Sequence, residues 1–461
     1  MSVSGRRINP QRLERTTFES SRAGEYFDAR QLSALTGGPQ DEFASVCLKE
    51  LIDNALDACE TSQVAPEVGV EVEREEGGVL RLSVSDNGPG IPPEVVRKVL
   101  DYSIRVSDKA AYRSPTRGAQ GNALKTIIGI PYALGSREPT VVEARGVQHT
   151  ISPWVDPAGE VHISHTEVPV GDASGVGTRV SLAIPGEEQD FDPLHWVRSF
   201  AAFNPHATIS YQGKTAVSEE AEMYRSTREL PFKKYVPSEP TSPHWYSPAS
   251  LQTLVFSYIA NARNGGRDLP LGEFVREFQG LSRTSKAKAI CSELPAFTHL
   301  SNFEEDPDAV GELLARMQET SKPPKPTALG CVGEGHFRAF FESVYFEAVK
   351  EIKYVRRSGL LPSGLPFTFE FALATLDQPG HLYTAINYSP TFGDPLEGTP
   401  IAGPQFKAHG INGFLSHGHA LPNSERAWYF SPTSVAVAAH IITPAPIFLD
   451  RGKTRLNMEG S

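Results

Sequence analysis

Three polar residues with helical spacing, Glu50, Asn54 and Asp57, are the first candidates for chemistry in this sequence. They stand at positions i, i+4 and i+7, so they share one face of a helix whose other side is apolar. Two carboxylates and an amide suit Mg2+ and an activated water, because hard cations prefer oxygen ligands. Asn54 supports this interpretation, since asparagine is a weak helix former with a carbonyl oxygen to offer. The alternative is an ordinary solvated face of an amphipathic helix.

A second candidate is Asp86, which follows an alternating apolar segment, residues 80–85. Alternation predicts a strand in which Asp86 lies on the buried face, at the point where that face ends. Gly88 and Gly90 leave room for a flat ligand near the backbone, and Asp86 can then accept a hydrogen bond from an exocyclic amine such as that of adenine. The alternative is an Asx turn at the end of a hairpin strand.

Two further segments, residues 116–128 and 177–184, complete the set of candidates. The first is a glycine-bearing loop that leads into a predicted helix, whose unpaired N–H groups and dipole attract phosphate. In the second, alternation places the hydroxyl of Thr178 on the interior face of a strand. Each signal alone is weak, but the four in this order make a strong one.

In order and spacing these segments resemble the Bergerat-fold ATPases of the GHKL superfamily, which includes gyrase, a heat-shock chaperone, histidine kinases and MutL. The resemblance implies ATP and Mg2+ as cofactors. It further implies that Glu50 orients the attacking water, that Asn54 holds magnesium and that Asp86 reads adenine. The cofactor-binding residues that it implies are Asn54, Asp57, Asp86, Gly88, Gly90, Ser107, Lys109, Gly118, Ala119, Gln120, Gly121, Asn122, Ala123, Leu124, Lys125, Thr178 and Lys453.

Some of these assignments have open alternatives. Residues 102–115 resemble the ATP lid, and the alternative is a plain surface loop. Lys109 and Lys125 can each reach a phosphate as a point charge, although a lysine in a loop is commonly just solvated. Ala123 stands where the family often has glycine, but MutL-type members have a similar Gly-Glu-Ala-Leu run, so we expect a competent pocket.

Other segments resemble the B subunits of type IIB DNA topoisomerases (topoisomerase VI). They are residues 18–27, 48–60 and 114–118 and the tetrapeptide 204–207, Asn-Pro-His-Ala. This resemblance implies a helix-two-turn-helix module, and a transducer domain whose switch lysine contacts the terminal phosphate. Lys453 is the predicted switch lysine, with catalytic rather than only binding function; the alternative is a charged tail lysine.

The elements that must position these residues divide into five predicted parts. The sequence predicts an N-terminal segment (1–40), an α+β Bergerat-fold ATP-binding domain (41–215), a linker (216–245), a helix-two-turn-helix-like domain (246–300) and an α/β transducer-like domain (325–455). In the ATP-binding domain we expect helices on one face of a mostly antiparallel sheet.

Periodicity refines the second half of the chain. Three short helices are predicted at 250–263, 271–278 and 282–294, then a long amphipathic segment at 336–357 and alternating strands at 367–374 and 382–387. Basic residues outnumber acidic ones in the helical part, which makes it the best candidate for contact with a DNA backbone. The alternative is a solvated charged face. The basic residues are Arg263, Arg267, Arg276, Arg283, Lys286 and Lys288.

Composition limits the function classes. A net charge of −11 argues against a protein that coats DNA by bulk charge, so any DNA contact is local. The four cysteines show no C-x-x-C spacing, which argues against a zinc site or a disulfide framework built from them. No apolar run approaches the ~20 residues that span a bilayer, so we expect a cytoplasmic protein without a membrane partner.

Together these observations predict an ATP-hydrolysing subunit of a topoisomerase VI-like enzyme. We expect an ATP-dependent homodimer that captures double-stranded DNA and works with an A-like cleavage subunit, without which it has no isomerase activity. The alternative is an ATP-switched clamp or scaffold that recruits an unrelated effector without strand passage. The sequence as given stops at Ser461, before the long helix by which type IIB enzymes hold the A subunit, and this favours the alternative.

Overall fold

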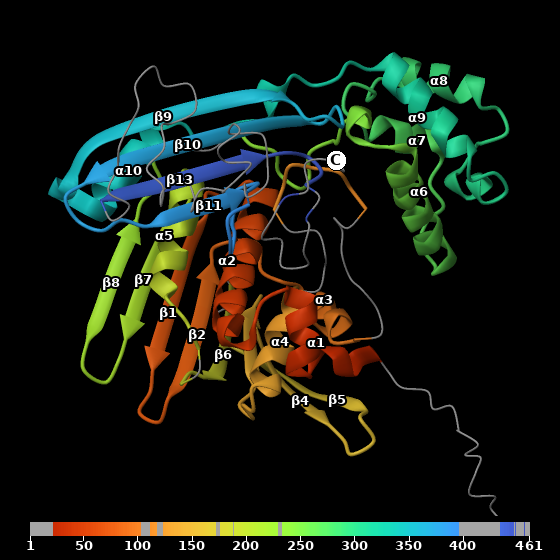
Figure 1. Cartoon of the computed structure of the whole chain (residues 1–461). Helices are drawn as coiled ribbons and strands as arrows, with labels where there is room; N and C mark the ends of the chain where they lie inside the picture. The colour runs from red at the N-terminus through yellow and green to blue at the C-terminus, as the bar shows by residue number, and fades with distance from the viewer. Residues whose placement is uncertain are drawn as a thin grey trace, which may run out of the picture.

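The computed structural model describes residues 22–102, 111–117, 123–171, 176–187, 189–228, 233–395, 434–446, 448 and 456. These residues form two β-sheets with helices packed on and between them, and a group of helices beside the second sheet (Figure 1). None of the described helices is long and apolar enough to cross a membrane.

The first sheet has eight strands in the order β5-β4-β3-β6-β2-β1-β7-β8. Neighbouring strands are antiparallel except β1 and β7, which are parallel, so the predicted mostly antiparallel sheet is confirmed. The strands are β1 Glu67–Arg74, β2 Val79–Asp86, β3 Thr140–Ala144, β4 Val147–Val155, β5 Val161–Pro169, β6 Thr178–Pro185, β7 Thr208–Lys214 and β8 Glu219–Tyr224.

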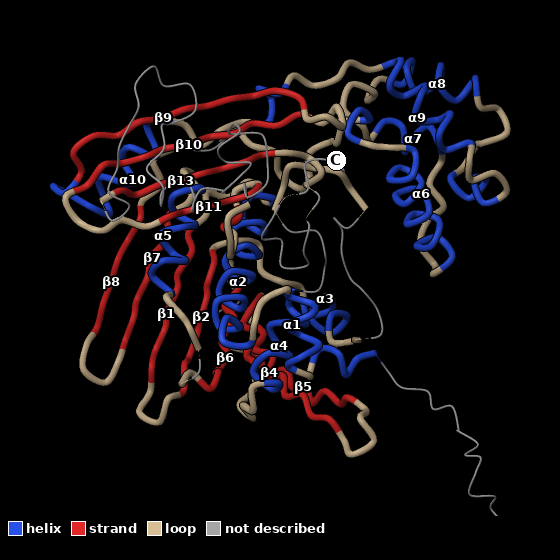
Figure 2. Tube along the Cα trace, viewed as in Figure 1, coloured by secondary structure: helices blue, strands red, loops and turns tan. Residues whose placement is uncertain are grey.

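One face of this sheet is covered by helices, as Figure 2 shows for α1, α2 and α4. The helices of this part are α1 Ala29–Thr36, α2 Phe43–Thr61, α3 Pro93–Val99, α4 Ala123–Ala133 and α5 Pro193–Phe203. The predicted α+β class with helices on one face is therefore confirmed.

Helix α2 is held by packing rather than by caps, since Glu42 at its N-cap makes no side-chain cap bond. Leu48, Ile52 and Leu56 on α2 have no exposed surface. Burial of each such side chain stabilises the fold by about 1.5–3 kcal/mol. This packing fixes the rotation of α2, and hence the direction in which its polar stripe points.

The second sheet has five strands in the order β12-β11-β13-β10-β9. They are β9 Val349–Leu360, β10 Pro366–Leu376, β11 Leu382–Ile386, β12 Ser389–Pro390 and β13 Val435–Ile442. Every residue of β13 is buried, since it lies between β10 and β11 and is covered on both faces. Helix α5 packs on β7 of the first sheet and on β11 and β12 of the second, so it joins the two sheets.

The predicted amphipathic segment at 336–357 is wrong as a single element. Helix α10, Glu334–Tyr345, covers only its first half, and β9 begins at Val349. The helix stops because Phe346 takes a positive φ of 47°, outside the helical region. From Val349 the chain pairs with β10 along its length, so tertiary pairing overrides the helical periodicity.

The predicted linker also contains structure. Its first part is strand β8, which pairs with β7 at the end of the eight-stranded sheet. The segment Glu-Glu-Ala-Glu-Met-Tyr lacks the β-branched residues that are typical of strands. Its own sequence therefore does not predict a strand, which depends on pairing with the neighbouring β7.

The helical group contains the three predicted helices and a fourth. They are α6 Pro248–Arg263, α7 Leu271–Arg276, α8 Thr284–Glu293 and α9 Ala309–Thr320. Helix α6 begins at a capping box made by Ser247 and Ser250, with Pro248 in the first turn. Helix α9 was missed by the sequence analysis, although its buried residues Val310, Leu313, Leu314 and Met317 have helical spacing.

Candidate functional site

Asp86 ends β2, and its carboxylate faces the start of β6. Its Oδ1 accepts hydrogen bonds from the backbone N–H of Gly88 at 2.7 Å and of Thr178 at 3.3 Å. Burial raises the pKa of this carboxyl, and the two N–H donors partly offset that effect. Both bonds go to Oδ1, so within the described residues Oδ2 is the oxygen left to accept from a ligand amine.

Two glycines bring the backbone against Asp86. A Cβ at Gly88 would lie 2.9 Å from Asp86 Oδ1 and 3.3 Å from the Cβ of Ala58 on α2. At Gly177, where φ is +88°, a Cβ would overlap the carbonyl oxygen of Asp86. The N–H of Gly177 donates to the carbonyl of Gly88 at 2.6 Å. The loop after β2 is therefore clamped between α2 and β6, and Gly90 in that loop takes a positive φ of 72°.

The polar stripe of α2 divides into an accessible part and an ion-paired part. Asn54 is exposed, and the Glu50 side chain keeps 30% of its surface with the Lys49 ammonium 3.7 Å away. Asp57 is only 14% exposed, and its Oδ1 lies 3.2 Å from Nη1 of Arg117. Glu50 and Asn54 are one turn apart and accessible, so their oxygens fit a hydrated Mg2+ and a water, whereas Asp57 is engaged with Arg117.

Several predicted site residues lie outside the described residues: Ser107, Lys109, Gly118, Ala119, Gln120, Gly121, Asn122 and Lys453. Helix α4 begins at Ala123, so the prediction that a helix follows the glycine-bearing loop is confirmed. Ala123 and Leu124 are half-buried in its first turn.

Lys125, in the same turn of α4, is buried. Its ammonium group donates to the carbonyl of Asp101 at 2.6 Å and lies 5.3 Å from the ring centre of Tyr102. Burial lowers its pKa. In this arrangement Lys125 holds the chain at the start of the predicted lid.

A buried group of polar side chains lies behind the α2 stripe, and sequence reasoning missed it. We call it the Arg117 cluster; it consists of Asp53, Asp57, Glu60, Arg117, Asn204, His206 and Lys234. Arg117 Nη1 lies 2.8 Å from Glu60 Oε1, and Nη2 donates to the side-chain oxygen of Asn204. Glu60 Oε1 also accepts from Lys234 Nζ at 2.7 Å and lies 2.8 Å from His206 Nε2.

Burial and neighbouring charges both shift the pKa values of the ionisable groups in this cluster. Burial alone would raise the pKa of Glu60, but Arg117, Lys234 and His206 hold it well below its ordinary value. Burial would lower the pKa of Arg117, but Glu60, Asp57 and Asp53 raise it instead. Burial and the charge of Arg117 lower the pKa of Lys234 to about 8, although Glu60 partly offsets them. Glu60 is therefore an anion shared by two buried cations.

The second sheet reaches the Arg117 cluster through the turn between β11 and β12. Ser389 Oγ donates to Asp53 Oδ2 at 2.7 Å, and Asn204 Nδ2 donates to the carbonyl of Tyr388 at 3.0 Å. The Lys234 ammonium lies 4.5 Å from the centre of the Tyr388 ring. The turn therefore contacts α2, α5 and the segment around Lys234 together.

This turn has a strained backbone. Asn387 and Tyr388 take positive φ values of 50° and 67°, which are uncommon for residues other than glycine. The N–H of Tyr388 donates to His440 Nε2 at 3.1 Å, and the Asn387 side chain bonds the backbone of Thr443 in both directions at 2.9 Å. His440 in turn lies 3.0 Å from the buried carboxylate of Glu370. Contacts with β13 and β10 thus hold the strained turn in place.

The basic residues predicted to contact DNA are partly engaged within the helical group. Four of them are bonded there: Arg263 to Glu304, Arg267 to Glu273, Arg276 to the carbonyl of Ser282, and Lys286 to the carbonyls of Gly280 and Thr320. Arg263 and Arg267 remain about two-thirds exposed, at 67% and 66%, so their ion pairs are weak. The DNA contact stays a prediction.

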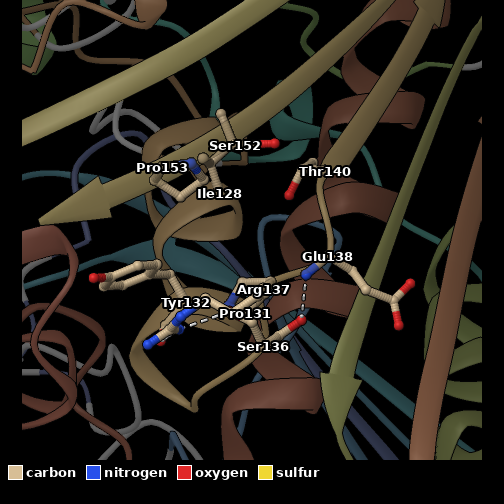
Figure 3. Close-up of a pocket in the computed structure, with 9 residues that line it drawn as sticks. All are labelled: Ile128, Pro131, Tyr132, Ser136, Arg137, Glu138, Thr140, Ser152 and Pro153. Atoms are coloured by element: carbon tan, nitrogen blue, oxygen red, sulfur yellow. Dashed lines mark hydrogen bonds between the residues drawn. The ribbon is translucent and has the colours of Figure 1, made fainter.

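Two cavities in the described part of the chain lie away from Asp86. One lies where the end of α4 meets β3 and β4 and is lined by Ile128, Pro131, Tyr132, Ser136, Arg137, Glu138, Thr140, Ser152 and Pro153 (Figure 3). Arg137, one of the lining residues, donates to the carbonyl of Tyr132 at 3.3 Å, and its guanidinium lies 4.3 Å from the Tyr132 ring centre. A second cavity lies between the 233–240 segment and the 278–282 turn. Neither contains a predicted site residue.

Comparison with known proteins finds a family match over part of this chain. The model of a family described as "Histidine kinase-, DNA gyrase B-, and HSP90-like ATPase" matches residues 41–188. The matched segment includes Glu50, Asn54, Asp86 and Thr178.

Curated proteins with similar sequences are named as the B subunits of "Type 2 DNA topoisomerase 6". The protein from Archaeoglobus fulgidus is 27% identical over 341 residues, which cover 71% of this chain and 53% of the relative. The protein from Methanococcoides burtonii is 26% identical over 381 residues, covering 76% and 55%. The protein from Natronomonas pharaonis is 30% identical over 220 residues, covering 46% and 26%. The chain thus spans about half the length of these relatives or less.

Solved structures also match along most of the chain. One is described as the N terminal domain of a DNA repair protein, with 11% identity, a TM-score of 0.39 and coverage of 89% of this chain and 87% of the other. Another is the B-subunit of DNA gyrase from Myxococcus xanthus, with 12% identity, a TM-score of 0.37 and coverage of 95% and 89%.

Proposed function

Since residues 41–188 carry a histidine kinase-, DNA gyrase B- and HSP90-like ATPase domain, we propose that this chain binds ATP between α2 and the end of β2 and hydrolyses it. The observation that carries the proposal is the setting of Asp86. Its Oδ1 is occupied by two backbone donors and its Oδ2 remains to accept from the adenine amine, while Gly88 lets the backbone of the loop pack closely against Asp86 and α2.

The steps of hydrolysis divide among a few residues. Glu50 accepts a hydrogen bond from the attacking water and orients it towards the terminal phosphate, with Asn54 one turn further along α2 as the residue that would hold Mg2+. When bound, Mg2+ offsets the negative charge of the phosphates. The first turn of α4 presents N–H groups for phosphate, and Lys453 is the residue we propose for the terminal phosphate.

We propose further that the chain acts as an ATP-gated component like the B subunit of topoisomerase VI. The names of the curated relatives support this. In this proposal ATP closes the lid, pairs two copies of the chain and captures DNA, and a topoisomerase VI A-like protein supplies the cleavage chemistry. The helical group would be the helix-two-turn-helix-like domain, and the second sheet the transducer-like domain.

The Arg117 cluster gives this proposal a physical route for coupling. Arg117 is followed directly by the predicted phosphate loop, and Asp53 and Glu60 lie on the helix that carries Glu50. Tyr388 and Ser389 of the second sheet contact the same cluster. A movement of the loop on nucleotide binding would therefore alter the contacts of the second sheet through a continuous set of buried side chains.

The second candidate function is an ATP-switched clamp that recruits an unrelated effector without strand passage. It is favoured by the helical group, where Arg263, Arg267, Arg276 and Lys286 already have partners within the group. Such a surface attracts a DNA backbone less than free basic side chains would.

Sedimentation with and without a non-hydrolysable ATP analogue tests the gate. We expect a dimer with the analogue and a monomer without it. A constant monomer under both conditions would contradict both candidate functions. Relaxation of supercoiled DNA by the chain together with a cleavage protein that bears a catalytic tyrosine would decide for the topoisomerase.

A further inference from the structure

A cluster of potential metal ligands lies on the β4–β5 hairpin. His149 on β4 is paired in register with Glu167 on β5, and Ile151 is paired with His165. Because side chains alternate across a strand, His149, His165 and Glu167 project from the same face of the hairpin. Arg97 of α3 binds Glu167 on this face.

The atoms of this cluster form a nearly regular triangle. His149 Nδ1 lies 3.0 Å from His165 Nε2 and 3.6 Å from Glu167 Oε1, and His165 Nε2 lies 3.7 Å from Glu167 Oε1. A single point about 2.0 Å from all three atoms therefore exists, and this is the length of bonds from zinc to histidine nitrogen and carboxylate oxygen. A hydrogen bond between the two imidazoles accounts for only one side of the triangle.

The cluster is anchored on one side and accessible on the other. The His149 side chain has no exposed surface, whereas His165 keeps 16% and Glu167 keeps 27%. The ring of His149 lies parallel to that of His165, with 15° between their planes. A cation could enter from the Glu167 side, where it would replace the hydrogen bond between the two imidazoles.

We propose that His149, His165 and Glu167 form a binding site for Zn2+. Two imidazoles and one carboxylate are a ligand set that zinc takes, with a water in the fourth position of the tetrahedron. This site is separate from the Asp86 site, and the proposal does not depend on ATP binding.

Arg97 competes with the metal for Glu167. Its guanidinium forms two bonds with the carboxylate, at 2.6 and 2.5 Å, one of them to Oε1, the oxygen that faces the imidazoles. Zn2+ would therefore share Oε1 with Arg97 Nε or displace that bond, and the positive charge of Arg97 opposes its binding. Arg97 is on α3, so metal binding would loosen the tie between α3 and the hairpin.

Zinc binding by the full chain tests the proposal, after treatment with a chelator and equilibrium dialysis against Zn2+. We expect one equivalent to bind. His165→Asn and Glu167→Gln should each weaken binding by at least about tenfold. Arg97→Gln should tighten zinc binding, because this substitution frees the Glu167 carboxylate. If the ion pair between Arg97 and Glu167 has only a structural role, the substitution should not increase the affinity for zinc. With Co2+ in place of Zn2+, tetrahedral coordination should give visible absorption bands that His165→Asn removes.

The matched control is His162→Asn on the same strand. His162 is on the opposite face from His165, where it stacks on Trp154 with ring centres 4.1 Å apart. Its substitution should leave zinc binding unchanged. Absence of stoichiometric binding by the parent chain, or an equal loss in His162→Asn and His165→Asn, would overturn the proposal. Circular dichroism of each variant shows whether the hairpin variants remain folded.

Discussion

Arg117 Nη1 lies 2.8 Å from Glu60 Oε1, with the guanidinium fully buried and the carboxylate 2% exposed. This ion pair joins the residue before the predicted phosphate loop to the last turns of α2, ten residues beyond Glu50. Because Glu60 is also the counter-ion of Lys234, its removal would leave two buried cations with one anion fewer.

Glu60→Gln should therefore destabilise the fold strongly. Loss of one partner from a buried ion pair reduces the free energy of unfolding by about 3–5 kcal/mol, since the remaining charges stay buried. Denaturant unfolding measures this reduction in the free energy of unfolding. The double variant Glu60→Gln/Lys234→Met should recover part of the loss. Glu73→Gln, which breaks the exposed pair with Lys214, is the matched surface control and should leave stability almost unchanged.

The same carboxylate should make stability depend on acid pH. The pKa of Glu60 in the folded chain is well below its ordinary value of 4.5, so the folded state favours the ionised form. Its contribution is fully present above the ordinary pKa and is lost as pH falls below it. The difference in unfolding free energy between the parent chain and Glu60→Gln should shrink as pH is lowered below that value. A difference independent of pH would contradict the assignment.

Glu50→Gln should separate hydrolysis from binding. A residue that orients and polarises the attacking water contributes about 10²–10⁴-fold to the rate, so turnover should fall by that order. The affinity for ATP should stay close to that of the parent, because Asp86 and the phosphate loop are untouched. Phosphate release and equilibrium binding of ATP measure the two quantities. Glu94→Gln on the exposed side of α3 is the control, and an unchanged rate in Glu50→Gln would remove Glu50 from the mechanism.

Asp86→Asn should weaken nucleotide binding itself. A hydrogen bond to a charged acceptor contributes about 1.5–3 kcal/mol, so the dissociation constant for ATP should rise roughly 10- to 100-fold. The amide can still accept from Gly88 and Thr178 through Oδ1, which then leaves an NH2 group where the adenine amine arrives. Affinity for GTP, whose ring carries a carbonyl at that position, should fall less. Equal losses for both nucleotides would count against adenine recognition by Asp86.

The last part of the predicted lid, at Tyr112, is attached to the helical group, and we expect this contact to couple the stability of the two parts. Tyr112 and Tyr258 share a hydrogen bond at 2.5 Å between their hydroxyls, and Tyr258 donates to Glu277 at 2.8 Å. Tyr112→Phe and Tyr258→Phe should therefore be non-additive, with an interaction energy of about 0.5–1.5 kcal/mol in a double-mutant cycle of unfolding free energies. Additive effects would show that the contact does not connect the two parts.

The local pattern of apolar and polar residues was sufficient to predict much of the fold. Strand β2 was predicted at residues 80–86 and is observed at Val79–Asp86, because Leu80, Leu82 and Val84 alternate with polar residues and all three are buried. Helix α2 was likewise evident from its apolar side. The pattern of apolar and polar residues did not predict β8 and β9, because each of these strands depends on pairing with its neighbour and not on its own residues.

The sequence predicted one part of the candidate site and missed another. The setting of Asp86 follows from one strand and the glycines beside it, so the sequence could indicate it. The Arg117 cluster could not be found from the sequence, because Glu60, Arg117 and Lys234 come from distant parts of the chain. Asp57 was expected on the accessible stripe, but a buried guanidinium supplied by another segment binds it.

The parallel pairing of β1 with β7 affects how this chain can be divided. The segment that matches the ATPase family ends at residue 188, whereas β7 and β8 lie at 208–224. A truncation at the end of the match would leave β1 as an open sheet edge with a row of unsatisfied backbone groups, and such edges promote self-association. It would also remove Asn204 and His206 from beside Arg117 and Glu60. A piece of this chain made for study should therefore extend past the recognisable motif, at least to the end of β8.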